Sequence, residues 1–190
     1  LVEPEPRQSA EEFLARNGHV PLPPYIRGGS DEPGDQVRYQ TVYANRPGAI
    51  AAPTAGLHFT DSLLDRTHKR GITVVQLTLH VGLGTFQPIR ESIEAHKMHA
   101  EWGELNAAAV GQINQCRANG GRAIAVGTTC VRVLETAAQS GELGPWCGET
   151  SIFIYPPYRF HCVDAFVTNF HLPRTTLLAL VCAFAGTDRT

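Results

Sequence analysis

The sequence predicts an α/β fold, with helices flanking a mostly parallel sheet that is either open or barrel-like. The first observation is that stretches typical of strands alternate along the chain with stretches typical of helices. The second is that the 190 residues are 43% hydrophobic and 18% charged, as in globular proteins with a sizeable core. The third is that no apolar run reaches the roughly 20 residues of a membrane span. Together they predict a globular protein with no membrane partner.

The first 35 residues are predicted to be a lead-in segment rich in proline and glycine. Residues 11–17 form a short predicted helix that ends at Gly18. The prolines among residues 21–24 exclude a helix there, because proline lacks a backbone donor. Residues 36–190 are predicted to form the α/β core.

The predicted elements of this core follow from capping residues, glycine stops and β-branched residues. Thr60, Asn106 and either Thr175 or Thr176 are expected to begin three of its helices. In order, the elements are a helix at 60–70, a strand at 72–80, a helix at 106–119, a strand at 123–126, a helix at 131–140, strands at 151–155 and 163–170, and a last helix that ends at Gly186.

The formal net charge of −2 gives the chain no overall basic field, so binding to a nucleic acid requires a local basic patch. The five cysteines are odd in number and contain no CxxC pair, which argues against a zinc ribbon and against a disulfide framework. Reduced thiols in a cytoplasmic protein are expected instead. The chain starts at Leu1 and stops four residues after Gly186, so we expect that it is truncated at both ends.

Four runs of polar residues and glycine stand where strands end or helices begin. They are residues 52–60, 78–86, 126–129 and 168–173. Ligands of parallel α/β folds bind beyond the carboxyl ends of the strands. Glycine lets the backbone approach a ligand closely, and helix amino ends favour anionic groups. Four such runs in one domain predict a ligand cleft.

Each run also has a purely structural interpretation. Gly82 and Gly84 are compatible with a simple bend, and they lack the GxGxxG pattern of a dinucleotide or Rossmann methyltransferase loop. Gly127 and the two threonines after it are compatible with a helix cap. Arg132 and Glu135 lie three residues apart on one predicted helix and are compatible with a surface ion pair that stabilises little.

The histidines offer a rival interpretation, a catalytic metal site. Five of them are candidate ligands: His58, His80, His96, His99 and His171. The spacing of His96 and His99 suits two ligands on one helical turn. The chain has no HExxH or HxH pattern and no clustered carboxylates, so we expect no metal.

Taken together, these runs resemble the S-adenosylmethionine:tRNA ribosyltransferase-isomerase family of queuosine biosynthesis. The resemblance extends from Pro21 to Gly186 and keeps the family's motifs in order. The matching stretches are residues 21–26, 39–44, 52–60, 78–86, 96–101, 125–129, 168–173 and 177–178. Four positions depart from the family's pattern: Gly28, Cys130, Val133 and Pro157.

The resemblance implies a larger two-domain protein, of which this chain is an incomplete part of the catalytic core. Family members also carry a further amino-terminal part of the core, an inserted β-barrel domain and a carboxyl-terminal tail, none of which we expect within the 190 residues. We therefore expect that the chain alone does not modify tRNA at a useful rate.

The implied reaction moves the ribosyl carbons of S-adenosylmethionine to a 7-aminomethyl-7-deazaguanine in tRNA and isomerises them to give epoxyqueuosine. Adenine and methionine leave. The resemblance thus implies S-adenosylmethionine as co-substrate, no metal, and tRNA that carries the 7-deazaguanine precursor as partner, with no obligate protein partner evident. Such an enzyme is expected in the cytoplasm.

The reaction needs a base that removes a proton next to the sulfonium and an acid that assists the departure of adenine, and histidine does either near neutral pH. The candidate catalytic residues are His58, His80 and His171, with their acid and base roles left open. The candidates for donor or substrate binding are Thr54, Gly82, Gly84, Thr85, Gly127, Thr128, Thr129, Arg132, Glu135 and Asn169, and the weaker candidates are His99 and Glu101.

Two other classes of function stay open: a non-catalytic RNA-binding or assembly module, and a metal-dependent hydrolase. Release of adenine from the donor separates the transferase from both. Metal analysis identifies the hydrolase.

Overall fold

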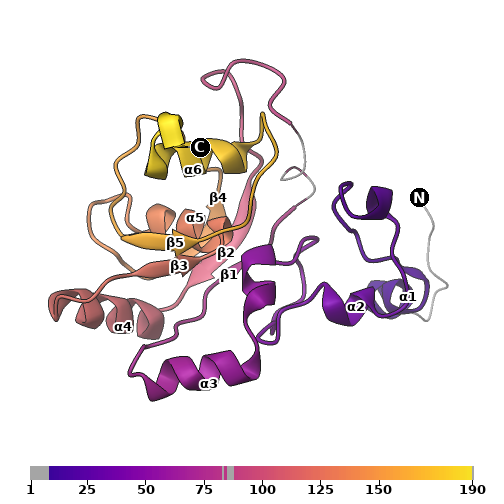
Figure 1. The fold of residues 1–190 in the computed structure, drawn as a ribbon, viewed down its shortest axis with the longest axis horizontal. Helices are drawn as coiled ribbons and strands as arrows, with labels where there is room; N and C mark the ends of the chain where they lie inside the picture. The colour runs from indigo at the N-terminus through magenta and orange to yellow at the C-terminus, as the bar shows by residue number, and fades with distance from the viewer. Residues whose placement is uncertain (1–8, 83, 85–87, 190) are drawn as a thin grey trace. The chain divides into compact units, whose positions relative to one another are not determined.

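The computed structural model describes residues 9–82, 84 and 88–189, and the chain divides into two compact units, Leu1–Tyr39 and Gln40–Thr190 (Figure 1). The assignment of residues 36–190 as a catalytic core stays a prediction, because compactness does not show what a unit does.

The first unit contains α1 (Ala10–Asn17), a short 3-10 helix η1 (Arg27–Gly29) and α2 (Asp35–Arg38). Ser9 and Glu12 form a capping box at the start of α1. The Ser9 hydroxyl accepts from the Glu12 N–H at 3.1 Å, and the Glu12 carboxylate accepts from the Ser9 N–H at 2.9 Å. Since α1 ends before Gly18, the helix predicted at 11–17 is confirmed, with one more residue at its start.

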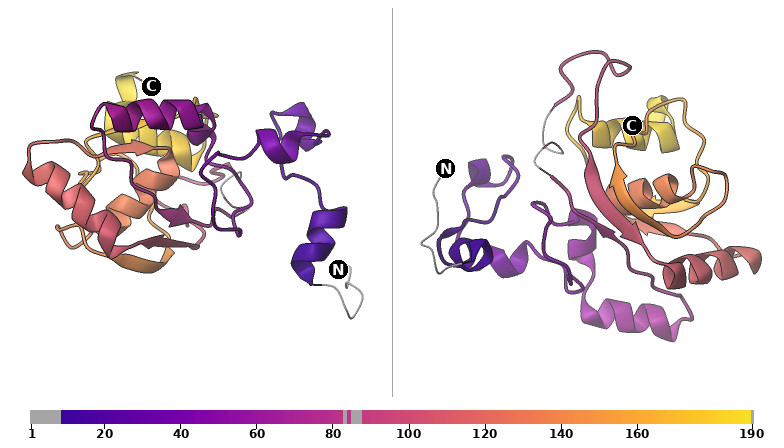
Figure 2. Two further views of the ribbon diagram at one scale, coloured as in Figure 1. Left: turned by 90° about the horizontal axis from the view of Figure 1, so that it is seen from below. Right: turned by 180° about the vertical axis from the view of Figure 1, so that it is seen from behind.

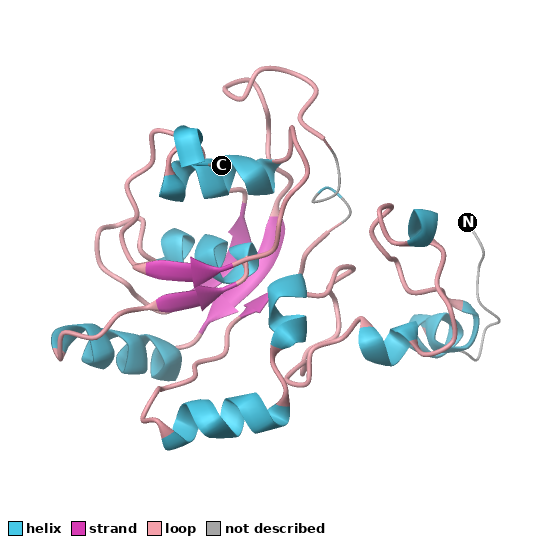
Figure 3. Ribbon diagram, viewed as in Figure 1, coloured by secondary structure: helices cyan, strands magenta, loops and turns pink. Residues whose placement is uncertain are grey.

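The second unit alternates helices with short strands. In chain order these are η2 (Thr54–His58), α3 (Asp61–Lys69), β1 (Thr78–Leu79), β2 (Glu101–Leu105), α4 (Ala107–Ala118), β3 (Ile124–Val126), α5 (Thr128–Ala137), β4 (Trp146–Thr150), β5 (Ala165–Val167), α6 (Thr176–Ala185) and η4 (Thr187–Arg189). Figure 3 shows the strands of this unit with α6 on one side and α3 and α4 on the other. Among the described residues, no helix is long and apolar enough to cross a membrane.

The strands form two small sheets (Figure 2). One is antiparallel, in the order β1-β2-β4, while β3 and β5 pair in parallel. Within the part of the chain that the structure describes, the strands close no barrel. The mixed α/β class is therefore confirmed, whereas the mostly parallel sheet is wrong, because two of the three strand pairings are antiparallel.

The error comes from two strands with a weak sequence signal. β2 and β4 each contain glycine and glutamate, residue types that are depleted in strands. They nevertheless pair over five residues, from Glu101 opposite Thr150 to Leu105 opposite Trp146. Both strands contact α5. Packing against this helix, rather than strand propensity, thus favours the antiparallel sheet.

Three predicted strands need correction. The strand predicted at 151–155 is wrong, because this stretch joins no sheet, although Ile154 packs into the core at 2% exposure. Within the stretch 72–80 only β1 pairs, and within 163–170 only β5 does. β-branched residues alone therefore overestimated the length of the strands.

The helix predictions are closer to the structure. Thr60, Asn106 and Thr175 each accept a hydrogen bond from a backbone N–H in the first turn of α3, α4 and α6. The helix predicted at 131–140 is α5, which begins three residues earlier because Gly127 is its N-cap.

The helix α5 forms the centre of the core. Six of its ten residues are buried, and Val131 and Val133 are completely inaccessible. Burying each of these side chains stabilises the fold by roughly 1.5–3 kcal/mol. Because α5 contacts strands of both sheets, it fixes the strand ends relative to its own first turn.

Candidate functional site

Gly127, at the start of α5, lies next to two of the other runs, residues 52–60 and residues 168–173. Its φ of +92° lies in the left-handed region, which favours glycine. Its N–H donates to the carbonyl of Val167 at 2.8 Å, directly before the run at 168–173. A Cβ at Gly127 would lie 4.0 Å from Cβ of Ala55, which belongs to η2. The first residues of α5, with Thr128 buried and Thr129 half-buried, therefore stand beside both runs.

Glu101 connects the remaining run to α5. The N–H of Gly82 donates to Glu101 Oε1 at 3.0 Å, and Nη1 of Arg132 donates to Glu101 Oε2. The side chains of Arg132 and Glu101 are only 5% and 4% exposed. Removing either partner leaves a buried charge uncompensated, so the pair holds α5 and Gly82 together. All four runs thus meet around the first turns of α5.

Glu135 fastens a neighbouring loop onto α5. Its fully buried carboxylate accepts from three consecutive backbone N–H groups at 161–163, at 2.9–3.0 Å, and from the Tyr158 hydroxyl at 3.2 Å. These bonds fill the lone pairs of a carboxylate, which favours bracing rather than ligand contact. The interpretation of Arg132 and Glu135 as a surface ion pair is wrong, because both are buried and Arg132 pairs with Glu101.

Two residues lie against the ring of His80. The ring of Trp102 is 5.1 Å away, centroid to centroid. Gly48 is the second, and a Cβ added there would lie 2.5 Å from both Nδ1 and Cε1 of the imidazole. Nε2 of His80 is buried, and no described residue forms a hydrogen bond with it. The ring is thus oriented by packing, and one nitrogen remains for another partner.

His171 follows β5 and is half-buried. Its Nε2 lies 2.8 Å from the hydroxyl of Thr168. Burial lowers the pKa of His171 below its usual 6.5, so the neutral ring is favoured at neutral pH. Asn169 is half-buried in the same run. Among the described residues, no hydrogen bond joins His171 to His58 or His80.

The remaining candidates lie at the ends of the other runs. His58 is exposed at the end of η2, and Thr54 is half-buried at its start. Gly84 lies against the exposed His99, because a Cβ on Gly84 would be 2.2 Å from His99 Cδ2. Thr85 lies outside the described residues, so its role stays a prediction.

Tyr43 was not among the predicted site residues. Its hydroxyl fills the space beside Gly56, where a Cβ would lie 2.0 Å away. Burial, followed by the nearby Cys130, raises the pKa of Tyr43 to about 12, and burial raises the pKa of Cys130 to about 11. Both groups are therefore protonated at neutral pH, and Cys130 is not a thiolate nucleophile. Sequence spacing gives no sign of the contact between Tyr43 and Gly56, because it joins a turn to η2 and depends on the folded arrangement.

The family model described as "Queuosine biosynthesis protein" matches residues 2–190. The chain belongs to this family. Over 176 residues it is 55% identical to the S-adenosylmethionine:tRNA ribosyltransferase-isomerase of Coxiella burnetii, strain Dugway, covering 92% of this chain and 51% of that protein. The protein of the same name from the Henzerling II strain is 54% identical, with the same coverage. The chain spans about half the length of these curated relatives.

A solved structure has a similar fold. The crystal structure of S-adenosylmethionine tRNA ribosyltransferase from Thermotoga maritima superposes with a TM-score of 0.58 at 44% sequence identity. The similarity covers 70% of this chain and 42% of that chain. The mixed α/β arrangement seen here is therefore similar to that of a solved family member.

The spacing argument for a metal site in this family member does not hold. His96 and His99 were paired on the assumption of a helical turn, but residues 96–100 are not helical. Within the described residues, no three side chains of His, Cys, Asp or Glu group in a way that could hold a metal ion.

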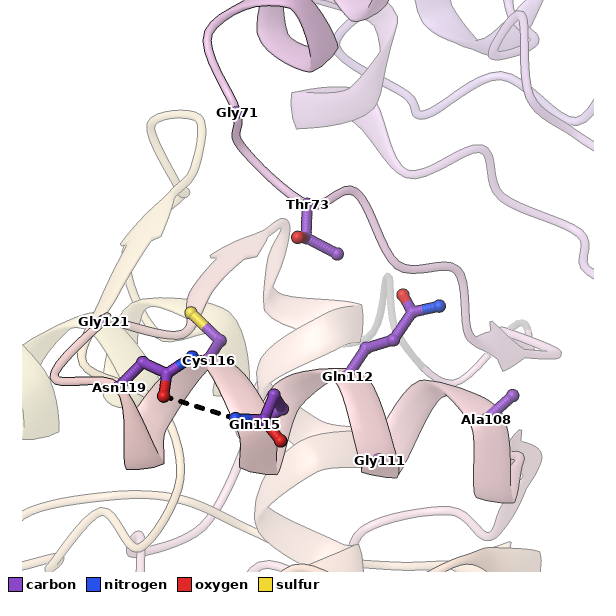
Figure 4. A pocket seen from close by; sticks show the side chains of 9 residues that line it. All are labelled: Gly71, Thr73, Ala108, Gly111, Gln112, Gln115, Cys116, Asn119 and Gly121. Atoms are coloured by element: carbon purple, nitrogen blue, oxygen red, sulfur yellow. Dashed lines mark hydrogen bonds between the residues drawn. The ribbon is translucent and has the colours of Figure 1, made fainter.

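Two surface hollows lie apart from the four runs. One, of about 560 Å³, lies between α4 and the segment around Thr73, and Figure 4 shows Gln115 and Asn119 joined by a hydrogen bond of 3.3 Å on its wall. The other, of about 910 Å³, is lined by residues of α5, β4 and the loop that includes Tyr158. None of the candidate catalytic residues lines either hollow.

Proposed function

We propose that this chain takes part in transferring the ribosyl moiety of S-adenosylmethionine to 7-aminomethyl-7-deazaguanine in tRNA. The moiety isomerises to give epoxyqueuosine, and adenine and methionine are released. The proposal is carried by the family match over residues 2–190, together with 55% identity to relatives that bear the name of this enzyme. The protein works in the cytoplasm as part of a larger two-domain enzyme.

The convergence of the four runs supports a single reaction site. Gly127 contacts η2 and the end of β5, while Glu101 connects Gly82 with Arg132. Bringing reactants into register is a large part of any two-substrate reaction. In the proposed site, the backbone at Gly82 and Gly127 approaches the donor, with the hydroxyls of Thr128 and Thr129 beside it.

The histidines supply the proton transfers. The reaction needs a base for a proton next to the sulfonium and an acid for the departing adenine. The lowered pKa of His171 suits a proton acceptor. His80 has a buried Nε2 without a partner among the described residues, which suits an acid or an orienting group. His58, exposed at the end of η2, is the third candidate.

The second substrate is tRNA whose 7-deazaguanine base leaves the stack to reach these groups, as enzymes acting on RNA bases require. Asn169, half-buried after β5, is a candidate for a hydrogen bond to the edge of that base. His99 lies against Gly84 and is a weaker candidate. S-adenosylmethionine is the co-substrate, and the reaction uses no metal.

Analysis of small products tests the proposal. The assay uses the chain itself and a chimera, in which the 176 aligned residues of the chain replace the matching residues of the Coxiella burnetii relative. With donor and precursor-bearing tRNA, the chimera is expected to release adenine and methionine. S-adenosylhomocysteine as the main product would show methyl transfer instead. Binding of tRNA by the chimera without any adenine release would indicate a non-catalytic RNA-binding module.

A further inference from the structure

Arg132 carries two buried donor nitrogens that have no partner among the described residues. Its Nη1 donates to Glu101, whereas no described residue accepts a hydrogen bond from Nε or Nη2. The residue as a whole is 4% exposed, so solvent does not replace the missing acceptor. A buried polar group without a partner lowers stability, and such a group in a folded protein calls for an explanation.

The two donors belong to one edge of the guanidinium. Nε and Nη2 project their hydrogens in parallel, and this edge matches the two oxygens of a carboxylate or a phosphate. Glu101 binds the group from the Nη1 side and leaves this edge open. Arg132 is thus oriented by one carboxylate and retains a complete two-donor edge for another anion.

The open edge lies beside the proposed donor site. Glu101 receives the Gly82 N–H on one oxygen and the Arg132 guanidinium on the other, so the guanidinium is next to the turn at Gly82. Arg132 also lies four residues after Thr128 in α5, which places both on one side of the helix. Side chains in a helix lean toward its amino end, in this case toward Gly127.

We propose that the Nε–Nη2 edge of Arg132 binds the α-carboxylate of S-adenosylmethionine. This assignment rests on the proposed function and names the part of the donor that the residue recognises. The guanidinium then lies between two carboxylates, that of Glu101 and that of the donor, and the α-ammonium of the donor offsets the second negative charge. The burial of Arg132 favours a small ligand over an RNA phosphate, which is attached to a bulky backbone. Glu101 acts as a positioning residue that holds the guanidinium in place.

The test compares two ligands by isothermal titration calorimetry on the full chain. They are S-adenosylmethionine and its decarboxylated analogue, which lacks only the carboxylate. A two-donor contact to a charged group predicts that the analogue binds roughly 10- to 100-fold more weakly. Equal affinity for the two ligands would overturn the assignment. Because this comparison uses the unaltered chain, it does not depend on whether a variant folds.

Arg132→Lys then identifies the residue responsible. Lysine keeps the charge beside Glu101 but cannot present two parallel donors. The variant is expected to lose most of its affinity for S-adenosylmethionine and to bind the decarboxylated analogue as the unaltered chain does. Arg122→Lys, at an exposed position, is the matched control and should change neither affinity. Equal weakening of both ligands by Arg132→Lys would show that the arginine only braces the fold.

Two further outcomes separate the possible sources of failure. If Arg132→Lys weakens the binding of tRNA but not of S-adenosylmethionine, the edge binds phosphate and the assignment is wrong. If the chain binds S-adenosylmethionine and its decarboxylated analogue with equal affinity while the chimera still releases adenine, the assignment fails and the proposed function stands. If the unaltered chain binds no donor and the chimera releases no adenine, both are contradicted.

Discussion

His80 shows how a single side chain can be fixed by its neighbours. Its ring lies against Trp102 and Gly48, and its Nε2 is buried. If it transfers a proton, His80→Ala in the chimera should lower turnover by roughly 10²-fold or more, with the fold intact. Steady-state kinetics of adenine release and circular dichroism measure the two effects. Near-normal turnover in a folded variant would leave His80 with a structural role.

A substitution at Gly48 tests whether the position of the His80 ring matters, because it leaves the imidazole itself in the chain. The φ of Gly48 is +139°, and an added Cβ would meet the imidazole at 2.5 Å. Gly48→Ala therefore displaces the His80 ring without removing it, and part of the loss in turnover should follow. Gly148→Ala serves as the control, because its φ of +154° imposes a similar backbone strain while nothing lies within 4 Å of the added Cβ.

His171 provides a prediction about pH. Burial holds its folded-state pKa below 6.5, so between the two pKa values the unfolded chain binds more protons than the folded chain. The contribution of the neutral ring to stability is therefore complete above pH 6.5 and is lost as pH falls through the folded pKa. An NMR titration of the ring protons should give a midpoint below 6.5, and a midpoint at or above that value would contradict the burial argument.

For single residues, the sequence indicated which side chains belong to the candidate site but not which residues they contact. Three of the predicted site residues lie around the start of α5: Gly82, Gly127 and Arg132. The partner of Arg132 was not foreseen, because Glu101 is 31 residues away in the chain. Gly48 gave no signal for the same reason, since its contact with His80 depends on the folded arrangement.

Among the elements, α5 supports both the core and the candidate site. Glu135 on this helix accepts three backbone N–H groups from residues 161–163. In Glu135→Gln one carboxylate oxygen becomes an NH₂ group that faces donors, which should destabilise the fold by about 1–3 kcal/mol. Urea unfolding measures the change. Glu142→Gln, at an exposed position, should alter stability by less than about 0.5 kcal/mol, and equal stability of the two variants would contradict the bracing role.

Elements with a local signal could be predicted, and elements defined by long-range packing could not. The caps at Thr60, Asn106 and Thr175 act within one turn; the first two were placed correctly, and for the last helix the sequence left Thr175 and Thr176 open. β2 and β4 depend on each other and on α5, and their residues have little strand propensity. The apolar stretch 151–155 had the stronger propensity but found no partner strand.

For the whole molecule, the alternation of elements predicted the α/β class but not the direction of the strands. Two small sheets, one antiparallel and one parallel, take the place of the expected mostly parallel sheet. The four runs still come together, because α5 contacts strands of both sheets. The four runs therefore meet because of α5, and not because their strands end at one edge of a common sheet.

The metal dependence of the reaction is a property of the whole enzyme. We expect the chimera to contain no stoichiometric transition metal and to keep its turnover in the presence of a chelator, because the proposed proton transfers use histidine. Elemental analysis and adenine release with and without chelator measure this. About one zinc per chain, with turnover lost on its removal, would instead support a metal-dependent hydrolase.

The proposed reaction passes ribosyl carbons from S-adenosylmethionine to a base in tRNA. The most direct measurement supplies the chimera with donor that is isotopically labelled only in its ribosyl carbons, followed by mass spectrometry of the nucleosides from digested tRNA. We predict that the modified 7-deazaguanosine carries all the labelled carbons and that adenine is released unlabelled. Label that stays in small molecules, or transfer of the methyl carbon alone to tRNA, would contradict it.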